Sequence, residues 1–285
     1  MNLKDAIEPY AAALKRKERS PRTIDWYRIW LKDLNNYLLF KDLEAITLTQ
    51  LRCWSDSLIE RNLKPSSRHG AARSAKVFFR WCVSEGYLTN DPAARLEVPV
   101  IPKRIPDTLT VSEVLALVNA AADSKNPVRD RTLVVFFTET GCRLSEVATL
   151  TIDRVNIDAG LAIVLGKGNK QRFAPFGEAT QKLLREWLAV RKVEGLSLFG
   201  LTKWGIALAI YRVGERAGVR VSPHKFRRTS ATLRAEAGAE VIDLQAIMGW
   251  EDVAMARIYV DQARLIAHAR NSSPVDLFLR DRLNK

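Results

Sequence analysis

The sequence predicts a mainly α-helical protein of two domains, on the basis of three observations. Apolar residues recur every three or four positions through most of the chain, which is the spacing of one buried helix face. A proline-rich stretch without this periodicity separates two helical regions, and a single pair of short strands flanks a glycine-containing turn. The length of 285 residues also suits about two domains of roughly 150 residues each.

The first domain, residues 1–95, is expected to contain four helices. The first spans roughly 3–17, and the second begins with Ser20 as N-cap and Pro21 at the first helical position. The third and fourth lie within 47–62 and 66–86, and Gly86 ends the fourth. The second helix has one apolar stripe, formed by Ile24, Tyr27, Leu31, Leu34 and Leu38.

Residues 96–108 are expected to link the domains, because the surrounding stretch NDPAARLEVPVIPKRIPD contains four prolines and no apolar period. The second domain, residues 109–285, is expected to be α-rich with a small antiparallel β element. Thr110 and Glu113 have the spacing of a capping box at the start of its first helix. The strands LAIVLG and QRFAPF flank the turn KGNK, and further helices follow.

The charge favours a polyanionic partner. The net charge is +13 and the isoelectric point is near 9.9. Residues 1–106 hold 19 basic and 12 acidic side chains, and the remainder holds 26 and 20, so both domains are basic. Charge alone leaves a merely basic cytosolic protein equally open.

The cysteines and the N-terminus indicate the cellular compartment of the protein. Cys53, Cys82 and Cys142 lie far apart without metal-ligand spacing, so we expect buried thiols in a reducing compartment. The N-terminus is too polar for a signal peptide, and no apolar run approaches the ~18 residues of a membrane span. A cytoplasmic, nucleoid-associated protein with no membrane partner is expected.

The stretch SPHKFRRTS, residues 222–230, predicts a helix capped by Ser222. His224 and Arg227 are i and i+3 on this helix and share a face, whereas Arg228 is expected to point elsewhere.

Upstream, Arg143 follows a glycine that can end a helix, and Glu146 comes three residues later. Such an arginine, oriented by a carboxylate, could complete a clamp for a phosphate. For Arg143 considered alone, a surface ion pair with Glu146 is the favoured interpretation.

Three further segments carry candidate groups. The hairpin offers Lys167, and a lysine on a short hairpin can give a proton to a leaving oxygen, although a solvated basic turn is equally open. GKGNK is not a Walker A loop, because no Gly-Lys-Ser/Thr closes it. Trp250 and Tyr259, each taken alone, would be packing residues. Together these groups are what metal-free phosphoryl transfer requires: guanidinium and indole donors for the phosphate oxygens, and a tyrosine hydroxyl as nucleophile.

In order and spacing, these groups resemble the tyrosine recombinase (phage integrase) family over nearly the whole chain. SPRTIDWYRIWLKDLNNYL resembles the start of that family's core-binding domain, and TGCRLSEVATL resembles its first catalytic box. LGKGNKQRFAPF resembles its β-hairpin, and SPHKFRRTSATLRAEAGAEVIDLQAIMGW with ARIYV resembles its second box. The chain is Xer-like in size, and Trp250 stands at the third-histidine position, as in Cre.

The resemblance implies a four-helix, SAM-like core-binding domain and a catalytic domain that cleaves and rejoins DNA. Tyr259 would form a 3′-phosphotyrosyl link, and Arg143 and Arg227 would clamp the phosphate with Glu146 supporting them. The catalytic groups would be completed by Lys167 as general acid for the 5′-oxygen, His224 in proton transfer, and Trp250 as hydrogen-bond donor. No metal, ATP or other cofactor is implied.

The implied partner is double-stranded DNA with specific recombination sites, bound as a homotetramer on two paired sites. The tail SSPVDLFLRDRLNK is expected to form a short oligomerisation helix. The expected DNA contacts are Arg22, Arg68, Arg73, Lys76, Lys103, Arg104, Lys170 and Arg172.

Two departures from the family pattern stand out. Met-Gly-Trp replaces the usual Leu-Gly-His, and Phe226 and Arg228 flank the second-box arginine, where they are expected to pack or orient. Three alternatives differ in function: a type IB topoisomerase, a non-enzymatic DNA-binding accessory protein, and a scaffold without a DNA role. The recombinase-like first domain argues against a topoisomerase. The complete set of candidate catalytic groups argues against an accessory protein, and the positive net charge argues against a scaffold without a DNA role.

Overall fold

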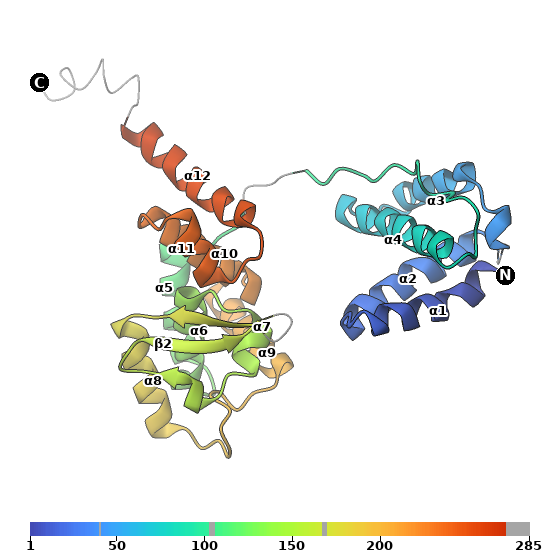
Figure 1. Cartoon of the computed structure of the whole chain (residues 1–285). Coiled ribbons are helices and arrows are strands. Elements are labelled where there is room, and N and C mark those ends of the chain that lie inside the picture. The colour runs from blue at the N-terminus through green and yellow to red at the C-terminus, as the bar shows by residue number, and fades with distance from the viewer. Residues whose placement is uncertain (40, 103–105, 167–169, 272–285) are drawn as a thin grey trace, which may run out of the picture. The chain divides into compact units, whose positions relative to one another are not determined.

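The structure is a computed structural model that describes residues 1–39, 41–102, 106–166 and 170–271. The chain divides into two compact units, Met1–Arg104 and Ile105–Lys285 (Figure 1). Unit 1 is helical, and unit 2 is α-rich with one small antiparallel sheet. This is the predicted fold class.

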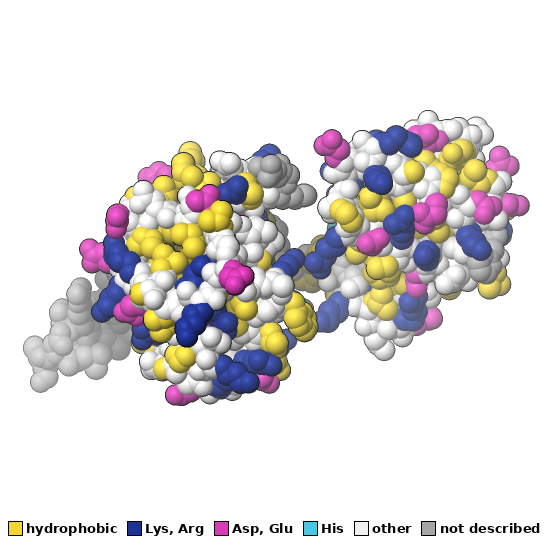
Figure 2. Space-filling view, turned by 90° about the horizontal axis from the view of Figure 1, so that it is seen from below, with side chains coloured by type: hydrophobic (Ala, Val, Ile, Leu, Met, Phe, Trp, Pro, Cys, Tyr) yellow, Lys and Arg dark blue, Asp and Glu magenta, His cyan; other side chains and the backbone are white. Residues whose placement is uncertain are grey.

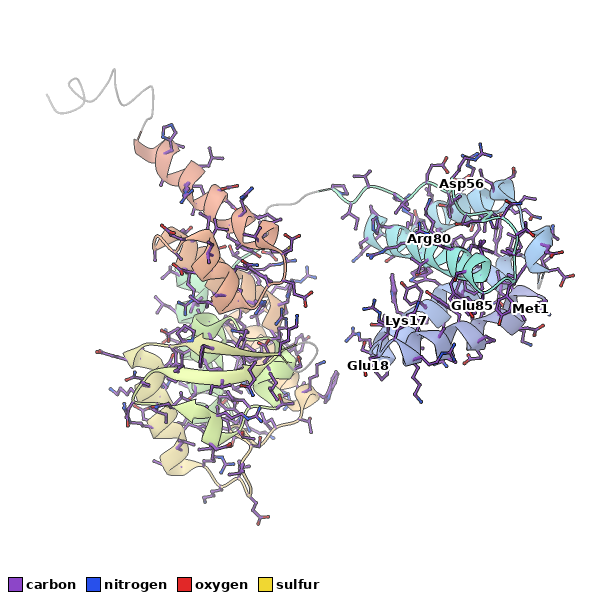
Figure 3. The ribbon with its side chains drawn as sticks, viewed as in Figure 1. Met1, Lys17, Glu18, Asp56, Arg80 and Glu85 are labelled. Atoms are coloured by element: carbon purple, nitrogen blue, oxygen red, sulfur yellow. The ribbon has the colours of Figure 1, made fainter. Side chains whose placement is uncertain are left out.

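Unit 1 contains the four predicted helices and one short 3-10 turn. Ser20 accepts the backbone N–H of Thr23, and Thr47 and Gln50 form a capping box, so side-chain caps fix two of the helix starts. Lys17 and Glu85, which are labelled in Figure 3, are the C-cap residues that follow the first and fourth helices. The elements are α1 (Leu3–Arg16), α2 (Pro21–Tyr37), η1 (Leu43–Ala45), α3 (Leu48–Glu60) and α4 (Pro65–Ser84).

The core of unit 1 is built from the apolar stripes of these helices. In α2 the predicted stripe faces inward: four of its residues are buried, and Tyr27 packs against them at the edge. Trp54 is fully buried, and its indole N–H donates to Asp33 on α2 at 2.9 Å. Arg61 pairs with the same carboxylate at 2.8 Å, which ties α3 to α2.

Unit 2 begins with the predicted capping box, in which Glu113 N–H donates to Thr110 Oγ1 and Thr110 N–H donates to Glu113 Oε2. The helices are α5 (Val111–Ala122), α6 (Pro127–Thr140), α7 (Leu144–Ala148), α8 (Glu178–Val190), α9 (Lys203–Ala217), α10 (Pro223–Glu236), α11 (Val241–Met248) and α12 (Val253–Asn271), with the 3-10 turn η2 (Ile152–Arg154). In Figure 1, α12 projects away from the rest of the unit.

The sheet has the order β1-β2-β3, with antiparallel neighbours. The strands β2 (Leu161–Leu165) and β3 (Gln171–Pro175) form the predicted hairpin, with Ile163 opposite Phe173. The third strand, β1 (Val155–Asn156), was not predicted, because two residues are too few to show a period of two.

Two apolar clusters organise unit 2. The larger one surrounds α6, whose Leu133, Val134, Phe136 and Phe137 are fully buried. The smaller one joins α10, α11 and α12, and it includes Met248 and Tyr259. The C-terminal ends of α6 and α11 therefore lie where the two clusters meet α10.

The cysteines are free thiols, but only Cys82 and Cys142 are buried. Cys53 is exposed, contrary to the prediction, because Leu51, Trp54 and Leu58 occupy the buried face of α3. Within the described part of the chain, we find no helix with the length and apolar character that crossing a lipid bilayer demands.

Candidate active site

The C-terminal end of α11 collects three arginines. Its carbonyl groups at Ile247, Met248 and Gly249 accept hydrogen bonds from Arg172, Arg227 and Arg143 in that order, one arginine for each residue. The last carbonyls of a helix have no partner within the helix and carry partial negative charge, so guanidinium donors are favoured there. One short helix therefore gathers side chains from β3, from α10 and from the start of α7.

Gly249 makes this arrangement possible. It ends α11 in the left-handed region at φ +60°, where residues with a Cβ are strained. A Cβ at this position would also lie 2.4 Å from Cδ of Arg172.

Gly141 ends α6 in the same way at φ +58°, and its carbonyl accepts Nη1 of Arg227 at 2.7 Å. Two helix ends thus hold Arg227 from two directions.

Arg143 is oriented by Glu146, as expected. Glu146 Oε1 accepts Nη1 of Arg143 at 2.7 Å, and Oε2 accepts the backbone N–H of Arg143 at 2.7 Å. The Glu146 side chain is 1% exposed. The pair is therefore not the surface ion pair that was the favoured interpretation of Arg143 by itself. Burial alone would raise the pKa of Glu146, but the hydrogen bond and charge of Arg172, together with the bonds from Arg143, lower it below its ordinary value.

Arg227 is almost fully buried and faces other cations. Burial, together with the charges of Arg143 and Arg172, lowers its pKa to about 10, although the charge of Glu146 offsets part of this fall. Its guanidinium carbon lies 5.5 Å from the centroid of the Trp250 ring. The site is therefore rich in positive charge that an anionic ligand would neutralise.

Tyr259 lies beside these groups. Its ring stacks on Trp250, with centroids 5.4 Å apart and planes 10° from parallel. Burial raises the pKa of the Tyr259 hydroxyl, and the charges of Arg228 and Arg227 offset part of that rise. A neighbouring cation favours the ionised phenol, which is the nucleophilic form.

His224 begins the same helix that carries Arg227. Ser222 accepts the N–H of Lys225 at 3.2 Å and caps α10, with Pro223 in the first turn, as predicted. His224 is exposed, yet loss of solvent around its ring, followed by the charges of Arg228, Arg227 and Arg143, lowers its pKa below 6.5. The imidazole is neutral at pH 7 and can accept a proton.

The pattern of the phage integrase family matches residues 107–265 of the chain. Tyrosine recombinase XerC of Mycobacterium tuberculosis is 31% identical over 283 residues, which cover 89% of this chain and 94% of that protein. XerC of Xanthomonas campestris pv. campestris is 29% identical over 267 residues, which cover 89% of this chain and 83% of that protein. The chain belongs to the phage integrase family. It is a tyrosine recombinase.

Solved structures share its fold. The Tn1549 transposon integrase in complex with transposon right end DNA superposes with a TM-score of 0.77 at 18% identity, covering 95% of this chain and all of that chain. XerH recombinase bound to a palindromic difH substrate gives a TM-score of 0.76 at 20% identity, covering 94% and 83% of the two chains.

Most of the candidate catalytic groups of this tyrosine recombinase lie in unit 2, around α10 and the end of α11. Contacts or charge effects connect Arg143, Arg227, His224, Trp250 and Tyr259. Lys167 lies outside the described residues, as do Lys103, Arg104 and the tail 272–285. Among the described residues, no group of three or more His, Cys, Asp or Glu side chains is placed to hold a metal ion.

Two residues that were expected to contact DNA have partners within the protein. The side chain of Arg172 is only 8% exposed and donates to Glu146 Oε2 at 2.7 Å, so most of it is turned into the protein. Lys76 Nζ donates to the carbonyls of Ala94 and Leu96 at 2.7 and 2.9 Å, which ties α4 to the chain that follows it. Sequence composition shows the charge of these residues but not the carbonyl and carboxylate partners that hold them.

The expected DNA contacts all stay predictions. Arg22 and Arg73 are exposed on α2 and α4, and Arg68 is half-buried. Lys170 is exposed and pairs with Glu251 at 3.2 Å. Figure 2 shows Lys and Arg side chains on the surface of both units.

A groove of about 640 Å³ adjoins the arginines. Its lining combines the cations Arg143, Lys170 and Arg172 with the carboxylates Glu251 and Asp252 and with the side chains of Trp250 and Met255. Through this groove a ligand can reach Arg143, whose side chain is about one-third exposed.

The position of Arg228 beside His224 and Tyr259 was not predicted from the sequence. This side chain was expected to point away, but its charge lowers the pKa of His224 and offsets the raised pKa of Tyr259. The signal was present, because His224 and Arg228 are i and i+4 on α10 and share a face. Phe226 packs as expected, with its ring stacked on Phe137 at 6.0 Å.

Proposed function

We propose that this tyrosine recombinase performs site-specific DNA recombination by cleaving and rejoining strands through a covalent link between Tyr259 and the 3′-phosphate. The observation that carries the proposal is the placement of Tyr259 on Trp250, beside two arginines anchored to helix carbonyls. The phenol oxygen attacks phosphorus, the bond to the 5′-oxygen breaks, and a 5′-hydroxyl is released. A 5′-hydroxyl from a partner duplex reverses the step and regenerates the phenol.

The clamp supplies charge for this step. Arg143 and Arg227 donate to the non-bridging oxygens, whose negative charge grows in the transition state. Their anchors are backbone carbonyls and the buried Glu146, so the guanidinium groups are held before DNA arrives. Trp250 adds an indole N–H donor. This preorganisation is the main contribution of the protein to the rate.

Proton transfers complete the reaction. Neutral His224 takes part in removing the proton from Tyr259, and Arg228 stabilises the phenolate. Lys167 gives a proton to the 5′-oxygen as that oxygen leaves. The bond energy is retained in the phosphotyrosine, so the proposed reaction requires neither ATP nor a metal ion.

The partner is double-stranded DNA carrying specific recombination sites, bound by four copies of the chain on two paired sites. Support for contacts between copies comes from α11 and α12, where Ile242, Met255, Ile258 and Leu265 are large apolar side chains exposed to solvent. The tail 272–285 is proposed to supply a further contact between copies. The λ integrase tetramer bound to a Holliday junction has this fold, with a TM-score of 0.76 at 19% identity. Native gels with one site and with two paired sites measure the assembly.

The decisive experiment traps the covalent intermediate. Duplexes that the wild-type protein selects from a random library are rebuilt with a nick beside the cleavage point, so that the released fragment diffuses away and the adduct accumulates. Tyr259→Phe removes one hydroxyl, and we expect it to abolish the adduct while DNA affinity stays within about threefold. Tyr211→Phe is the matched control, because Tyr211 is exposed on α9. An adduct formed by the Tyr259→Phe protein would assign the nucleophile elsewhere.

The alternatives differ in this assay. A topoisomerase of type IB forms the same adduct but reseals the same strand, so products with exchanged strands from two labelled duplexes separate the two. A non-enzymatic accessory protein forms no adduct.

A further inference from the structure

Arg172 is a buried cation that the proposed reaction leaves without a role. It lies on β3, five residues beyond Lys167 in the sequence, and its side chain is 8% exposed. Its donors reach Glu146 Oε2 at 2.7 Å, the carbonyl of Ile247 and, at 3.5 Å, Sγ of Cys142. Its Nη1 also donates to the carbonyl of Phe173 at 3.3 Å, and its Nε donates to Glu146 Oε1 at 3.4 Å. These bonds hold most of the Arg172 side chain within the protein.

Glu146 has two cationic partners instead of one. Its Oε1 accepts Arg143, and its Oε2 accepts Arg172, each at 2.7 Å. With Arg143 alone, the carboxylate would cancel the single positive charge of the clamp arginine and could take both edges of its guanidinium. With Arg172 also present, the three groups together keep one positive charge.

The geometry of Arg143 agrees with this division. Of the guanidinium nitrogens of Arg143, Nη1 donates to the carboxylate, while Nη2 reaches the carbonyl of Gly249 at 3.2 Å. Both side chains border the groove, but that of Arg143 stays about one-third exposed, whereas that of Arg172 is 8% exposed. A ligand in the groove therefore meets mainly Arg143, while Arg172 is held against Glu146.

We propose that Arg172 is a positioning residue that balances the charge of Glu146, so that Glu146 orients Arg143 without neutralising it toward the scissile phosphate. This inference rests on the proposed function. Through the carbonyl of Ile247, Arg172 also fixes β3 against the helix end that holds Arg143 and Arg227. Loss of Arg172 thus removes positive charge from the clamp as well as one anchor of the strand.

The test measures single-turnover adduct formation on the nicked, selected duplex described above. Arg172→Gln removes the balancing charge, and we expect cleavage to slow about 100-fold, comparable with the loss of one transition-state donor. Glu146→Gln combined with Arg172→Gln removes both charges, and it should cleave at least about tenfold faster than Arg172→Gln alone. Arg172→Lys keeps the charge and should stay within about tenfold of wild type. A purely structural role predicts the reverse for the double variant, because it loses more native contacts.

Arg234→Gln is the matched structural control. Arg234 is a half-buried arginine of α10 that donates to the carbonyls of Glu139 and Pro175, so it also anchors β3, and it has no hydrogen bond to Glu146 among the described residues. Its loss should lower the melting temperature about as much as Arg172→Gln while the cleavage rate of the folded protein stays near wild type. Circular dichroism identifies variants that do not fold, and Arg172→Lys decides the question if Arg172→Gln is one of them.

The proposal is overturned if Arg172→Gln cleaves at the wild-type rate or the double variant is no faster than Arg172→Gln. It is equally overturned if Arg172→Lys is as slow as Arg172→Gln, or Arg234→Gln is as slow as either. The proposed function itself is judged by the wild-type protein: without a Tyr259-dependent adduct, that function fails and the inference fails with it.

Discussion

The ring of Trp250 stacks on the ring of Tyr259, with centroids 5.4 Å apart and planes 10° from parallel. Stacked aromatic pairs add about 0.5–1.5 kcal/mol beyond area burial, enough to restrict where the tyrosine hydroxyl lies. Trp250 therefore has two separable roles in our proposal: it supports the nucleophile through its ring and serves the phosphate through its N–H.

Substitutions of Trp250 should separate these roles. Trp250→Phe keeps a stacking ring and loses the donor, so we expect adduct formation to slow about 100-fold, which is typical for one lost donor. Trp250→His keeps a ring and a donor and should remain within about tenfold of wild type. Trp250→Ala should be the slowest, because Tyr259 also loses its support. Single-turnover cleavage measures all three, and a Trp250→Phe protein with the wild-type rate would remove the donor role.

The glycine at the end of α11 gives a test of the carbonyl anchors. At Gly249, an added Cβ meets the strain of φ +60° and a contact of 2.4 Å to Arg172. Left-handed backbone costs a residue with a Cβ about 1–2 kcal/mol, and displacing Arg172 adds to this. We expect Gly249→Ala to lower both the free energy of unfolding and the cleavage rate.

Gly218→Ala is the control for backbone strain. Gly218 ends α9 at φ +65°, and an added Cβ there has no neighbour within 4 Å among the described residues. This variant should lose similar stability from strain and keep its cleavage rate. Equal cleavage by the two variants would mean that the contact between Gly249 and Arg172 has no part in the site.

The features of the site that could be predicted from the sequence are those that depend on neighbouring residues. The caps at Ser222 and Thr110 depend on three neighbouring residues, and the spacing of Arg143, Arg227 and Tyr259 is carried by contiguous motifs. The carbonyl anchors are different: the bond from Arg143 to Gly249 spans 106 residues and that from Arg172 to Ile247 spans 75. Such partners depend on how α11 packs against α10 and β3.

The strand β3 shows why the place of Arg172 was not predicted. An amphipathic strand usually turns apolar side chains inward and polar ones outward. Here Phe173 is 61% exposed, while its neighbours Arg172 and Ala174 are buried. Arg172 is held inward by its bonds to Glu146 and Ile247, and a pattern of apolar and polar residues does not show such distant partners.

The pH dependence of cleavage tests His224. Loss of solvent and the nearby charges of Arg228, Arg227 and Arg143 lower its pKa below 6.5. The imidazole is therefore neutral above that pH and gains its proton only on further acidification. We expect the titration of His224 to leave the single-turnover cleavage rate constant from pH 8 to pH 6.5 and to lower it at more acidic pH.

A His224→Gln variant should cleave more slowly and lose this acidic decline. Glu146 does not interfere in the same range, because its pKa lies below its ordinary value of 4.5. An unchanged acidic decline in His224→Gln would assign the titration to another group.

The role of Lys167 as general acid can be tested by changing the leaving atom of the DNA substrate. If this lysine protonates the 5′-oxygen, a substrate whose leaving atom needs little protonation should not require it. A 5′-bridging phosphorothiolate leaves as a thiolate, so Lys167→Ala should be slow on ordinary DNA and near wild type on the sulfur substrate.

Lys170→Ala is the matched control in the same hairpin, and the Lys170 side chain is exposed and paired with Glu251 at 3.2 Å. We expect Lys170→Ala to cleave both substrates at similar rates. Equal slowing of Lys167→Ala on both substrates would exclude it as the general acid, and rescue of Lys170→Ala by sulfur would transfer the role to Lys170.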